Sequence, residues 1–447
     1  MSCNHTNHIK PDQVFDVIGR HMLADGFPLV VDLEKSQGAY IHDSWHNRDF
    51  VDFFSYFAST PLGMNHPKMK EPCFLAKLQR AALHKVSNSD FYTVEMAEFV
   101  DTFSRVALPD YLHYLFFIDG GALAVENAIK AAFDWKVRKN FAKGHIREVG
   151  HQVIHFRDAF HGRTGYTMSM TNTDPAKIDL YPKFNWPRVL NPKLSFPVTD
   201  EVLERVKQDE ELALRQVMQA IHDNPDDIAA LIIEPIQAEG GDNHFRPEFL
   251  HALRKITLEN DILFVLDEVQ TGIGITGKMW AHQHFDLQPD IVCFGKKTQI
   301  CGIAVSKRID EAHDNVFHLP SRINSTWGGN LADMVRSQRY LEIIQEDKLV
   351  ENAAVQGKYI QEHLHRLAGK HPDLMSNIRG RGLMTAFTLP CRESRHNLLA
   401  ACRDRGVILL PSGQNSIRFR PPLDIDREAI DEGFARMEKA LADVTRG

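Results

Sequence analysis

The chain has 447 residues, which exceeds one ordinary domain and is enough for two or three domains that share a large core. Hydrophobic residues make up 43% and charged residues 25% of the chain, as in ordinary soluble globular proteins. The 52 basic and 59 acidic residues give a formal charge of -7 without a Lys/Arg-rich tract. This balance does not favour nucleic acid or an anionic membrane as partner, so we expect small-molecule ligands.

The cysteines and the first segment bear on location and metal content. Residues 1–26 lack the apolar core of a signal peptide, and no apolar run is long enough to span a bilayer. The cysteines are scattered without a CxxC pair, which favours neither zinc nor a disulfide framework and predicts a cytoplasmic location. The stretch "HTNH" at residues 5–8 is a weak metal candidate, because such a pair in a polar terminus is more often disordered. We expect no metal.

The predicted elements begin with a hairpin. Residues 38–55, "GAYIHDSWHNRDFVDFFS", have the pattern of two paired strands. Between about residues 113 and 300, short apolar runs alternate with helical patterns; the runs are "YLFFI", "QVIHF", "IAALIIEPI", "ILFVLDEV" and "DIVCF". Near-continuous apolar strands separated by helices predict a mainly parallel sheet covered on both faces.

The C-terminal part has a different pattern. The stretches "RGLMTAFTL" and "GVILLPSGQNSIRFRPPL" predict antiparallel strands, and "DREAIDEGFARMEKALADV" repeats apolar residues at helical spacing. We predict an α/β protein with a large domain at residues 71–335. Residues 1–70 and 336–447 would together form a small α+β domain built from both chain ends.

Three predicted strand ends carry polar features that could share one crevice, because ligands gather at the carboxyl ends of parallel strands. Gly120, Gly121 and Ala122 lie between a strand and a helix, where main-chain N–H groups can hold a phosphate. Asp267 ends the strand "ILFVLD", where it either caps a helix or pairs with a cationic ring nitrogen. Pyridoxal phosphate requires such a carboxylate together with a lysine that forms an imine.

The lysine candidates are adjacent. "FGKKTQICG", residues 294–302, follows the apolar run "DIVCF". The two ammonium groups either mark a solvated loop or include a desolvated nucleophile. The literal GxGxxG at residues 272–277 is a poor dinucleotide fingerprint, since a polar cluster separates it from the strand and no acid ends the next strand.

Several stretches carry a resemblance to a known family. They are "GGALAVENAIK", "FHGRTGYT", "IIEPIQAEGG", "LDEVQTGIGITGKMWAHQHF", "PDIVCFGKK" and "NSTWGGN". Through them nearly the whole chain resembles the class III aminotransferases, fold-type I enzymes that use pyridoxal 5'-phosphate. The resemblance implies a Schiff-base lysine and a homodimer with active sites at the subunit interface.

The resemblance also implies residue roles. The family's Schiff-base lysine follows the glycine of "FGK", which makes it Lys296, while Lys297 tunes the charge or points away. Asp267 would bind the pyridine nitrogen. The other implied cofactor contacts are Gly121 and Ala122 to the phosphate, Phe160 and Val269 on the ring faces, Gln270 to the phenolic oxygen, and Thr326 to the phosphate from the neighbouring subunit. The family has two adjacent glycines where this chain has "TQICG", which leaves the conformation of that loop open.

Two arginines suit carboxylate substrates, although each could form an ordinary surface ion pair. They are Arg163 and Arg418. Within the family, "FHGRTGYTMSMTNT", "EGGDNHFRPEFL" and "SRINSTWGGN" are most similar to enzymes that transfer the 6-amino group of L-lysine to 2-oxoglutarate. Glu239 would then pair with Arg418 while lysine is bound and swing aside for 2-oxoglutarate. Asn324 would help Arg163 hold the α-carboxylate of lysine.

The implied products are L-glutamate and 2-aminoadipate 6-semialdehyde, which cyclises to piperideine-6-carboxylate. Three alternatives stay open. Another ω-aminotransferase, acting on ornithine or 4-aminobutyrate, would share the catalytic residues. A racemase or decarboxylase of this fold would not depend on 2-oxoglutarate. A regulatory protein would need a DNA-binding helix pair, whereas residues 1–60 have hairpin patterns.

Overall fold

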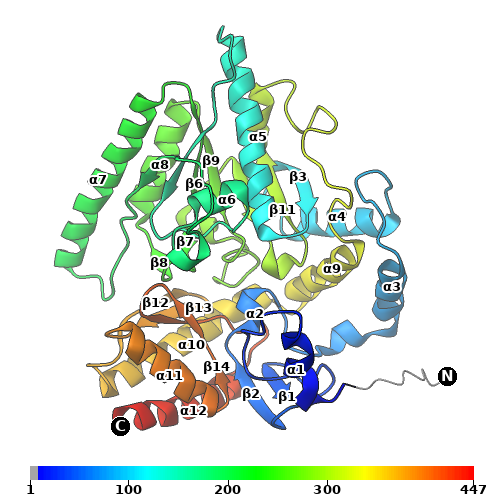
Figure 1. Ribbon diagram of the computed structural model, residues 1–447, viewed down its shortest axis with the longest axis vertical. Coiled ribbons are helices and arrows are strands. Elements are labelled where there is room, and N and C mark those ends of the chain that lie inside the picture. Colours follow the sequence, from blue (N-terminus) through cyan, green and yellow to red (C-terminus); the bar gives the residue numbers. More distant parts are fainter. Residues whose placement is uncertain (1–8, 447) are drawn as a thin grey trace.

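The computed structural model describes residues 9–446, and its largest sheet has seven strands in the order β3-β11-β10-β9-β6-β4-β5 (Figure 1). Their bounds are β3 Leu112–Ile118, β4 Gln152–Phe156, β5 Arg188–Val189, β6 Ile228–Ile233, β9 Leu263–Asp267, β10 Ile291–Phe294 and β11 Cys301–Ser306. β11 runs antiparallel to β3 and β10, and the remaining pairs are parallel. Each of the five predicted runs overlaps a strand of this sheet, which confirms the prediction of a mainly parallel sheet.

Helices cover both faces of this sheet, as predicted (Figure 1). The helices of this half of the chain are α3 Pro72–Leu83, α4 Val94–Val106, α5 Gly121–Ala142, α6 Gly165–Met170, α7 Asp200–Asp223 and α8 Pro247–Glu259. Alternate residues of β9 point to opposite faces: Leu263 and Val265 pack in the cluster that contains α5, while Phe264 and Leu266 pack with α8. Burial on both faces explains why β9 is apolar up to its last residue, Asp267.

A second group of strands joins distant parts of the sequence. β1 Tyr40–Asp43 and β2 Arg48–Asp52 form the predicted hairpin, and β14 Val407–Ile408 pairs in parallel with β2. A four-stranded antiparallel sheet has the order β12-β13-β16-β15, with bounds Ser376–Arg381, Met384–Thr388, Ser416–Phe419 and Leu410–Ser412. The short pair β7 Ile236–Gln237 and β8 Asn243–His244 completes the strands of the described chain. The predicted antiparallel C-terminal strands are confirmed.

The remaining helices are α1 Val14–Gly19, α2 Ser55–Ala58, α9 Leu331–Glu346, α10 Leu349–Lys370, α11 Arg392–Asp404 and α12 Arg427–Arg446. The last of these confirms the predicted C-terminal helix. The division into residues 1–70, 71–335 and 336–447 stays a prediction, and its second boundary falls within α9.

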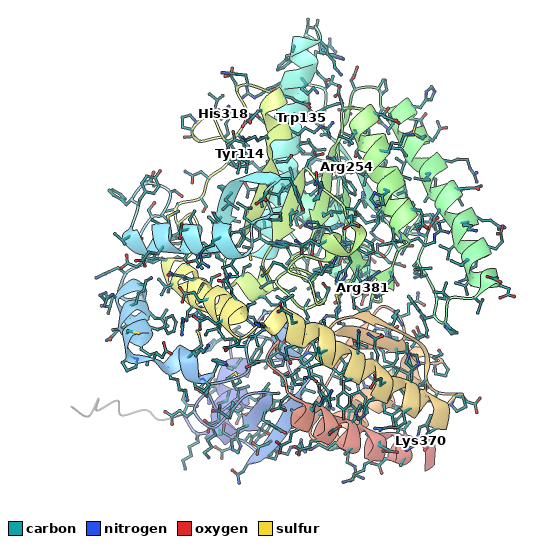
Figure 2. The ribbon with its side chains drawn as sticks, turned by 180° about the vertical axis from the view of Figure 1, so that it is seen from behind. Tyr114, Trp135, Arg254, His318, Lys370 and Arg381 are labelled. Atoms are coloured by element: carbon teal, nitrogen blue, oxygen red, sulfur yellow. The ribbon has the colours of Figure 1, made fainter. Side chains whose placement is uncertain are left out.

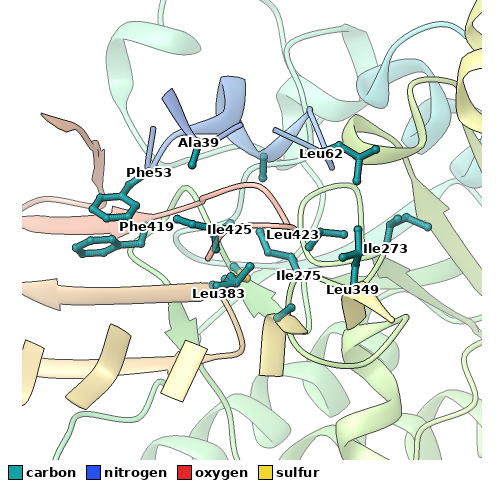
Figure 3. Packing of buried hydrophobic residues seen from close by; sticks show 14 of the residues in the cluster. Ala39, Phe53, Leu62, Ile273, Ile275, Leu349, Leu383, Phe419, Leu423 and Ile425 are labelled. Atoms are coloured by element: carbon teal, nitrogen blue, oxygen red, sulfur yellow. The ribbon is translucent and has the colours of Figure 1, made fainter. Parts of the chain in front are cut away.

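One apolar cluster joins the two chain ends to the middle of the chain (Figure 3). Phe53, after β2, and Phe419, on β16, have ring centroids 5.1 Å apart. Ile273 and Ile275, from the turn that follows β9, pack in the same cluster. In Figure 2, Arg381 lies where the four-stranded sheet meets the large sheet, with its guanidinium carbon 5.0 Å from the ring centroid of Phe285. The two sheets therefore share one continuous core.

The glycine-rich turn after β9 has a packing role. A Cβ on Gly272 would lie 2.6 Å from a ring carbon of Trp280, and one on Gly277 would lie 2.9 Å from the Cβ of Ala354 on α10. Both glycines allow close approach of neighbouring segments. This explains the GxGxxG at residues 272–277 without a dinucleotide.

In the part of the chain from residue 9 to residue 446, the helices are all too short or too polar to cross a membrane. The same residues contain no cluster of three or more His, Cys, Asp or Glu side chains that could hold a metal ion. The "HTNH" stretch lies outside the described residues.

Candidate active site

The predicted functional residues follow strands that end at one edge of the seven-stranded sheet. β9 and β10 are parallel, and β3 shares their direction because the antiparallel β11 lies between β3 and β10. Asp267 ends β9 opposite Cys293, Lys296 follows β10 after Gly295, and Gly121 begins α5 after β3. The carboxylate, the amine and the helix N-terminus predicted at three strand ends therefore lie at one edge.

Lys296 lies in a tight turn between β10 and β11. Burial lowers the pKa of its amine, the nearby guanidinium of Arg418 lowers it further, and Asp267 and Glu239 act in the opposite direction. A lysine whose pKa is lowered has a larger unprotonated fraction at neutral pH and is a better nucleophile. Lys296 is thus positioned among the charged residues that the sequence singled out.

Gln299 shapes the "TQICG" part of this turn. Its φ of 60° lies in the left-handed region that favours glycine. Its side-chain amide donates to the main-chain oxygens of Ser59, at 2.6 Å, and of Lys296, at 3.2 Å. These hydrogen bonds stabilise a non-glycine residue in that conformation. They explain how the "TQICG" sequence can form this turn.

Lys297 is fully buried and differs from its neighbour in its contacts. Its ammonium donates to the main-chain oxygens of Gln270, at 2.8 Å, and Ala58, at 3.2 Å. Burial lowers the pKa of Lys297 well below its usual value, and the charge of Lys296 lowers it further. Lys297 links the turn to two other segments, so neither lysine belongs to a solvated loop.

Asp267 has a partner that the sequence analysis did not identify. The carboxylate accepts a hydrogen bond at 2.7 Å from Nδ1 of His161, which is fully buried, and another at 3.1 Å from the N–H of Val269. His161 directly follows Phe160 in "FHGR", so its position beside a predicted cofactor contact could have indicated it. These two contacts fix the orientation of the Asp267 carboxylate.

Glu234 is a second buried carboxyl beside this pair. It follows β6 and accepts hydrogen bonds from the N–H groups of Phe160 and Ala238, both at 3.0 Å. Burial raises the pKa of Glu234 to about 7, with His161 and Asp267 acting in opposite directions. Because it fixes the main chain at Phe160, Glu234 positions the segment that carries His161.

The start of α5 is closely packed against the strand ends. α5 begins at Gly121, after Gly120 with a φ of 97°. A Cβ on Gly121 would lie 2.9 Å from Cγ1 of Val269, so any larger residue would push that side chain away. The first N–H groups of a helix have no partner within the helix and favour an anion. The predicted phosphate residues Gly121 and Ala122 thus begin a 22-residue helix next to Val269.

The carboxylate of Glu239 lies between two cations. Its Oε2 accepts from Arg418 on β16 at 2.5 Å, and its Oε1 accepts from Lys177 at 2.6 Å. Burial alone would raise the pKa of Glu239, but Arg418 and Lys177 outweigh it and lower the pKa to about 2. The predicted pair of Glu239 and Arg418 is present, and no sequence pattern indicated Lys177.

A second arginine organises the same region. Arg420 donates through both terminal nitrogens to Asp242, at 2.6 and 3.0 Å, and through Nε to Oε1 of Gln270 at 3.0 Å. Arg418 also reaches Oε1 of Gln270, at 3.4 Å. The carbonyl end of the Gln270 side chain is therefore held by arginines, which leaves its amide N–H groups for the predicted cofactor oxygen.

Three predicted site residues differ from this buried group in their exposure. Arg163, Asn324 and Thr326 are exposed. The main-chain oxygen of Thr326 accepts from the hydroxyl of Ser87, so the loop of residues 321–330 packs on the segment before α4. Their exposure distinguishes them from the buried residues around Lys296.

Comparisons with known proteins assign the family. The Aminotransferase class-III family matches residues 22–441. The chain belongs to the class III aminotransferases. L-lysine-epsilon aminotransferase of Mycobacterium tuberculosis is 51% identical over 436 residues, 97% of this chain and 96% of that protein. The protein of that name from Streptomyces clavuligerus is 47% identical over 440 residues, 98% and 96% of the two chains.

A solved structure of lysine aminotransferase from M. tuberculosis matches with a TM-score of 0.95 and 50% identity, covering 98% of this chain and all of that one. A 4-aminobutyrate aminotransferase from Emericella nidulans is more distant, at 32% identity over 96% of this chain and 87% of that protein. The fold of this class III aminotransferase is thus confirmed as fold-type I.

The residues of this class III aminotransferase fit pyridoxal phosphate. The helix N-terminus at Gly121 suits a phosphate, the oriented Asp267 suits a ring nitrogen, and Lys296 supplies an amine with a lowered pKa. The absence of a side chain on Gly121 lets the start of the helix approach Val269 closely. The chain is a pyridoxal-phosphate-dependent aminotransferase.

Proposed function

We propose that this enzyme transfers the 6-amino group of L-lysine to 2-oxoglutarate and forms 2-aminoadipate 6-semialdehyde and L-glutamate. The observation that carries the proposal is the contact of Glu239 with Arg418 beside Lys296. An arginine that a glutamate neutralises suits a site that must accept a carboxylate in one half-reaction and lack it in the other. The names of the 47–51% identical relatives support the same substrate.

Lys296 is the proposed attachment point of the cofactor and the base of the reaction. Its lowered pKa favours the free amine that attachment requires. With the cofactor bound, the same amine would act as the base that moves the proton from C6 of lysine. Lys297 cannot exchange roles with it easily, because its ammonium is held by two main-chain oxygens.

When bound, pyridoxal phosphate supplies an aldehyde for the amino group and a ring that accepts electrons from the substrate carbon. Asp267 would hold the ring nitrogen in its protonated form, and His161 keeps that carboxylate oriented. Phe160 and Val269 would hold the ring faces, Gln270 the phenolic oxygen, and Gly121 and Ala122 the phosphate. An oriented group of this kind contributes on the order of 3 kcal/mol to transition-state stabilisation.

We propose a homodimer in which Thr326 reaches the phosphate of the partner subunit. The loop that carries Thr326 also carries Trp327, which is 46% exposed, and it contacts the segment that leads to Phe91 and Tyr92, which are 71% and 81% exposed. Contiguous exposed apolar side chains are typical of interfaces. In such a dimer Arg163 and Asn324 would serve the α-carboxylate of lysine. The cytoplasm stays the proposed location, supported by the five free cysteines of the described chain.

Isotope transfer tests the proposal and separates it from the alternatives. Lysine labelled with 15N at Nε should give 15N-glutamate from 2-oxoglutarate, whereas lysine labelled at Nα should give unlabelled glutamate. Parallel reactions with ornithine and 4-aminobutyrate should run much more slowly. Label transfer from Nα, or faster turnover of either competitor, would contradict the assignment. A racemase or decarboxylase would form no glutamate.

A further inference from the structure

Lys177 is the second cation that contacts Glu239, and it comes from a segment that contributes no other predicted site residue. It ends the short 3-10 turn Pro175–Lys177. Asp174 caps the start of this turn, because the Asp174 carboxylate accepts a hydrogen bond from the N–H of Ala176 at 3.1 Å. The Lys177 ammonium lies 2.6 Å from Oε1 of Glu239 and 5.3 Å from the ring centroid of Phe160. Its side chain is 17% exposed.

The two cations hold different oxygens of the same carboxylate. Arg418 holds Oε2 and Lys177 holds Oε1. Glu239 can therefore turn away from Arg418 without losing its contact with Lys177. A carboxylate in a mostly buried position is costly without a cation, and the Glu239 side chain is only 26% exposed.

We propose that Lys177 determines acceptance of the dicarboxylate substrate, because its ammonium retains Glu239 when the carboxylate next to the reacting carbon of that substrate takes Arg418. This inference rests on the proposed function, in which Glu239 is a switch: it pairs with Arg418 while lysine is bound and releases Arg418 for the dicarboxylate. In the released state two ion pairs would exist, Arg418 with the substrate and Lys177 with Glu239. With lysine bound, Glu239 keeps both cations.

Removal of the Lys177 charge should therefore affect the two half-reactions unequally. Without it, the state that binds lysine keeps the pair of Glu239 with Arg418. The state that binds a dicarboxylate leaves Glu239 without a cation. Lys177 acts through Glu239 and is a positioning residue, so the expected change is in dicarboxylate affinity and KM.

The test compares Lys177→Gln with Lys177→Arg, which keeps a positive charge, in the holoenzyme. Lys193→Gln is the matched control, since Lys193 pairs with Asp158 at 2.8 Å and its side chain is 47% exposed. Glutarate, a dicarboxylate that cannot react, is titrated by calorimetry, and single-turnover rates are measured with glutamate and with lysine. Melting temperatures identify any variant that fails to fold.

For Lys177→Gln we expect a rise of about tenfold in the glutarate Kd and in the glutamate concentration for half-maximal rate, the size of one ion pair of about 1.4 kcal/mol. The values for lysine should change less than twofold. Lys177→Arg should restore most of the affinity, and Lys193→Gln should match the wild type. An unchanged or lower glutarate Kd in Lys177→Gln would overturn the inference.

A double-variant cycle decides whether Lys177 acts through Glu239. In the Glu239→Ala background, Lys177→Gln should not change the glutarate Kd further. A similar loss in both backgrounds would mean that Lys177 binds the substrate itself and would contradict the inference. If Glu239→Ala affects lysine and glutamate equally, the switch fails and this inference fails with it. If Glu239→Ala behaves as proposed, a silent Lys177→Gln rejects only the role of Lys177.

Discussion

Two adjacent lysines show how contacts, and not burial alone, separate their roles. Burial lowers the pKa of both Lys296 and Lys297. The amine of Lys297 donates to two main-chain oxygens, so its N–H groups are engaged in hydrogen bonds. Lys296 lies instead in the field of Arg418, Asp267 and Glu239. The sequence could indicate the pair, but only these contacts distinguish its members.

We expect Lys296→Ala to abolish both the visible absorbance of covalently attached cofactor and turnover. Lys297→Met should keep the attachment but lower the melting temperature, because two buried carbonyl oxygens lose their donor at about 1–3 kcal/mol each. Borohydride reduction followed by peptide mapping reads the attachment point directly. A cofactor adduct on Lys297 would contradict the assignment.

The charge state of Glu239 predicts a pH dependence of stability. Its pKa in the folded protein is about 2, below its usual 4.5, owing to Arg418 and Lys177. A lowered folded-state pKa stabilises the fold fully above pH 4.5, and this contribution is lost as the pH falls toward 2. The wild type should therefore melt higher than Glu239→Gln at pH 6, and the difference should shrink by pH 3. A difference that is equal at both pH values would contradict this explanation.

At the scale of elements, most strands of the large sheet could be predicted from apolar runs in the sequence. β9 and β10 were predictable because their residues are buried on both faces, and Asp267 stood out as a carboxylate at the end of such a run. β11, Cys301–Ser306, was not predicted, since it follows the lysines directly and begins with a glycine-containing stretch. Gly302 is required there: a Cβ would lie 2.2 Å from the main-chain oxygen of Phe116 on β3.

The turn α2 was beyond prediction for a different reason. Ser55, Tyr56, Phe57 and Ala58 have φ angles of 37–62° and form one left-handed turn. That conformation costs about 1–2 kcal/mol for each residue other than glycine, so no local propensity favours it. Tertiary contacts hold it instead: the Ser55 hydroxyl donates to the main-chain oxygen of Arg420 at 2.6 Å, and Ala58 accepts from Lys297.

Two glycine substitutions test the account of β11. Gly302→Ala should lower stability by more than about 2 kcal/mol, because the added methyl group overlaps the neighbouring strand. Gly369→Ala, near the end of α10 with no atom within 4 Å of the added Cβ, should be neutral or stabilise by up to about 1 kcal/mol. Denaturant unfolding measures both. Equal effects would show that the close approach at Gly302 is wrong.

At the scale of the whole molecule, the site lies where two sheets from different parts of the chain meet. Asp267 ends a strand of the middle segment, and Lys296 and Glu239 follow other strands of it. Arg418 comes from the C-terminal sheet. The sequence pattern could place each residue at a strand end or on a strand. It could not show that Lys177 and His161 complete the group, because their contacts depend on how distant segments pack.

The proposed dimer can be tested by charge insertion at the exposed apolar surface. Tyr92→Glu should shift the enzyme toward monomers and weaken cofactor binding, since Thr326 of the partner would be lost. Ile146→Glu is the matched control, because Ile146 is 93% exposed and follows the C-terminal end of α5 in the chain. Sedimentation velocity and cofactor titration give both readouts. A wild type that sediments as a 50.9 kDa monomer at micromolar concentration would exclude the dimer.

The two half-reactions of Glu239→Ala test the central claim most directly. Lysine leaves Arg418 without a carboxylate partner, so the variant should react with lysine at least tenfold more slowly. Glutamate brings its own carboxylate, so that half-reaction should be spared or improved. Single-turnover absorbance changes of the bound cofactor, recorded separately with each amino acid, measure both rates. We predict a slowed reaction with lysine beside an unimpaired reaction with glutamate, and an equal slowing of both would contradict the switch.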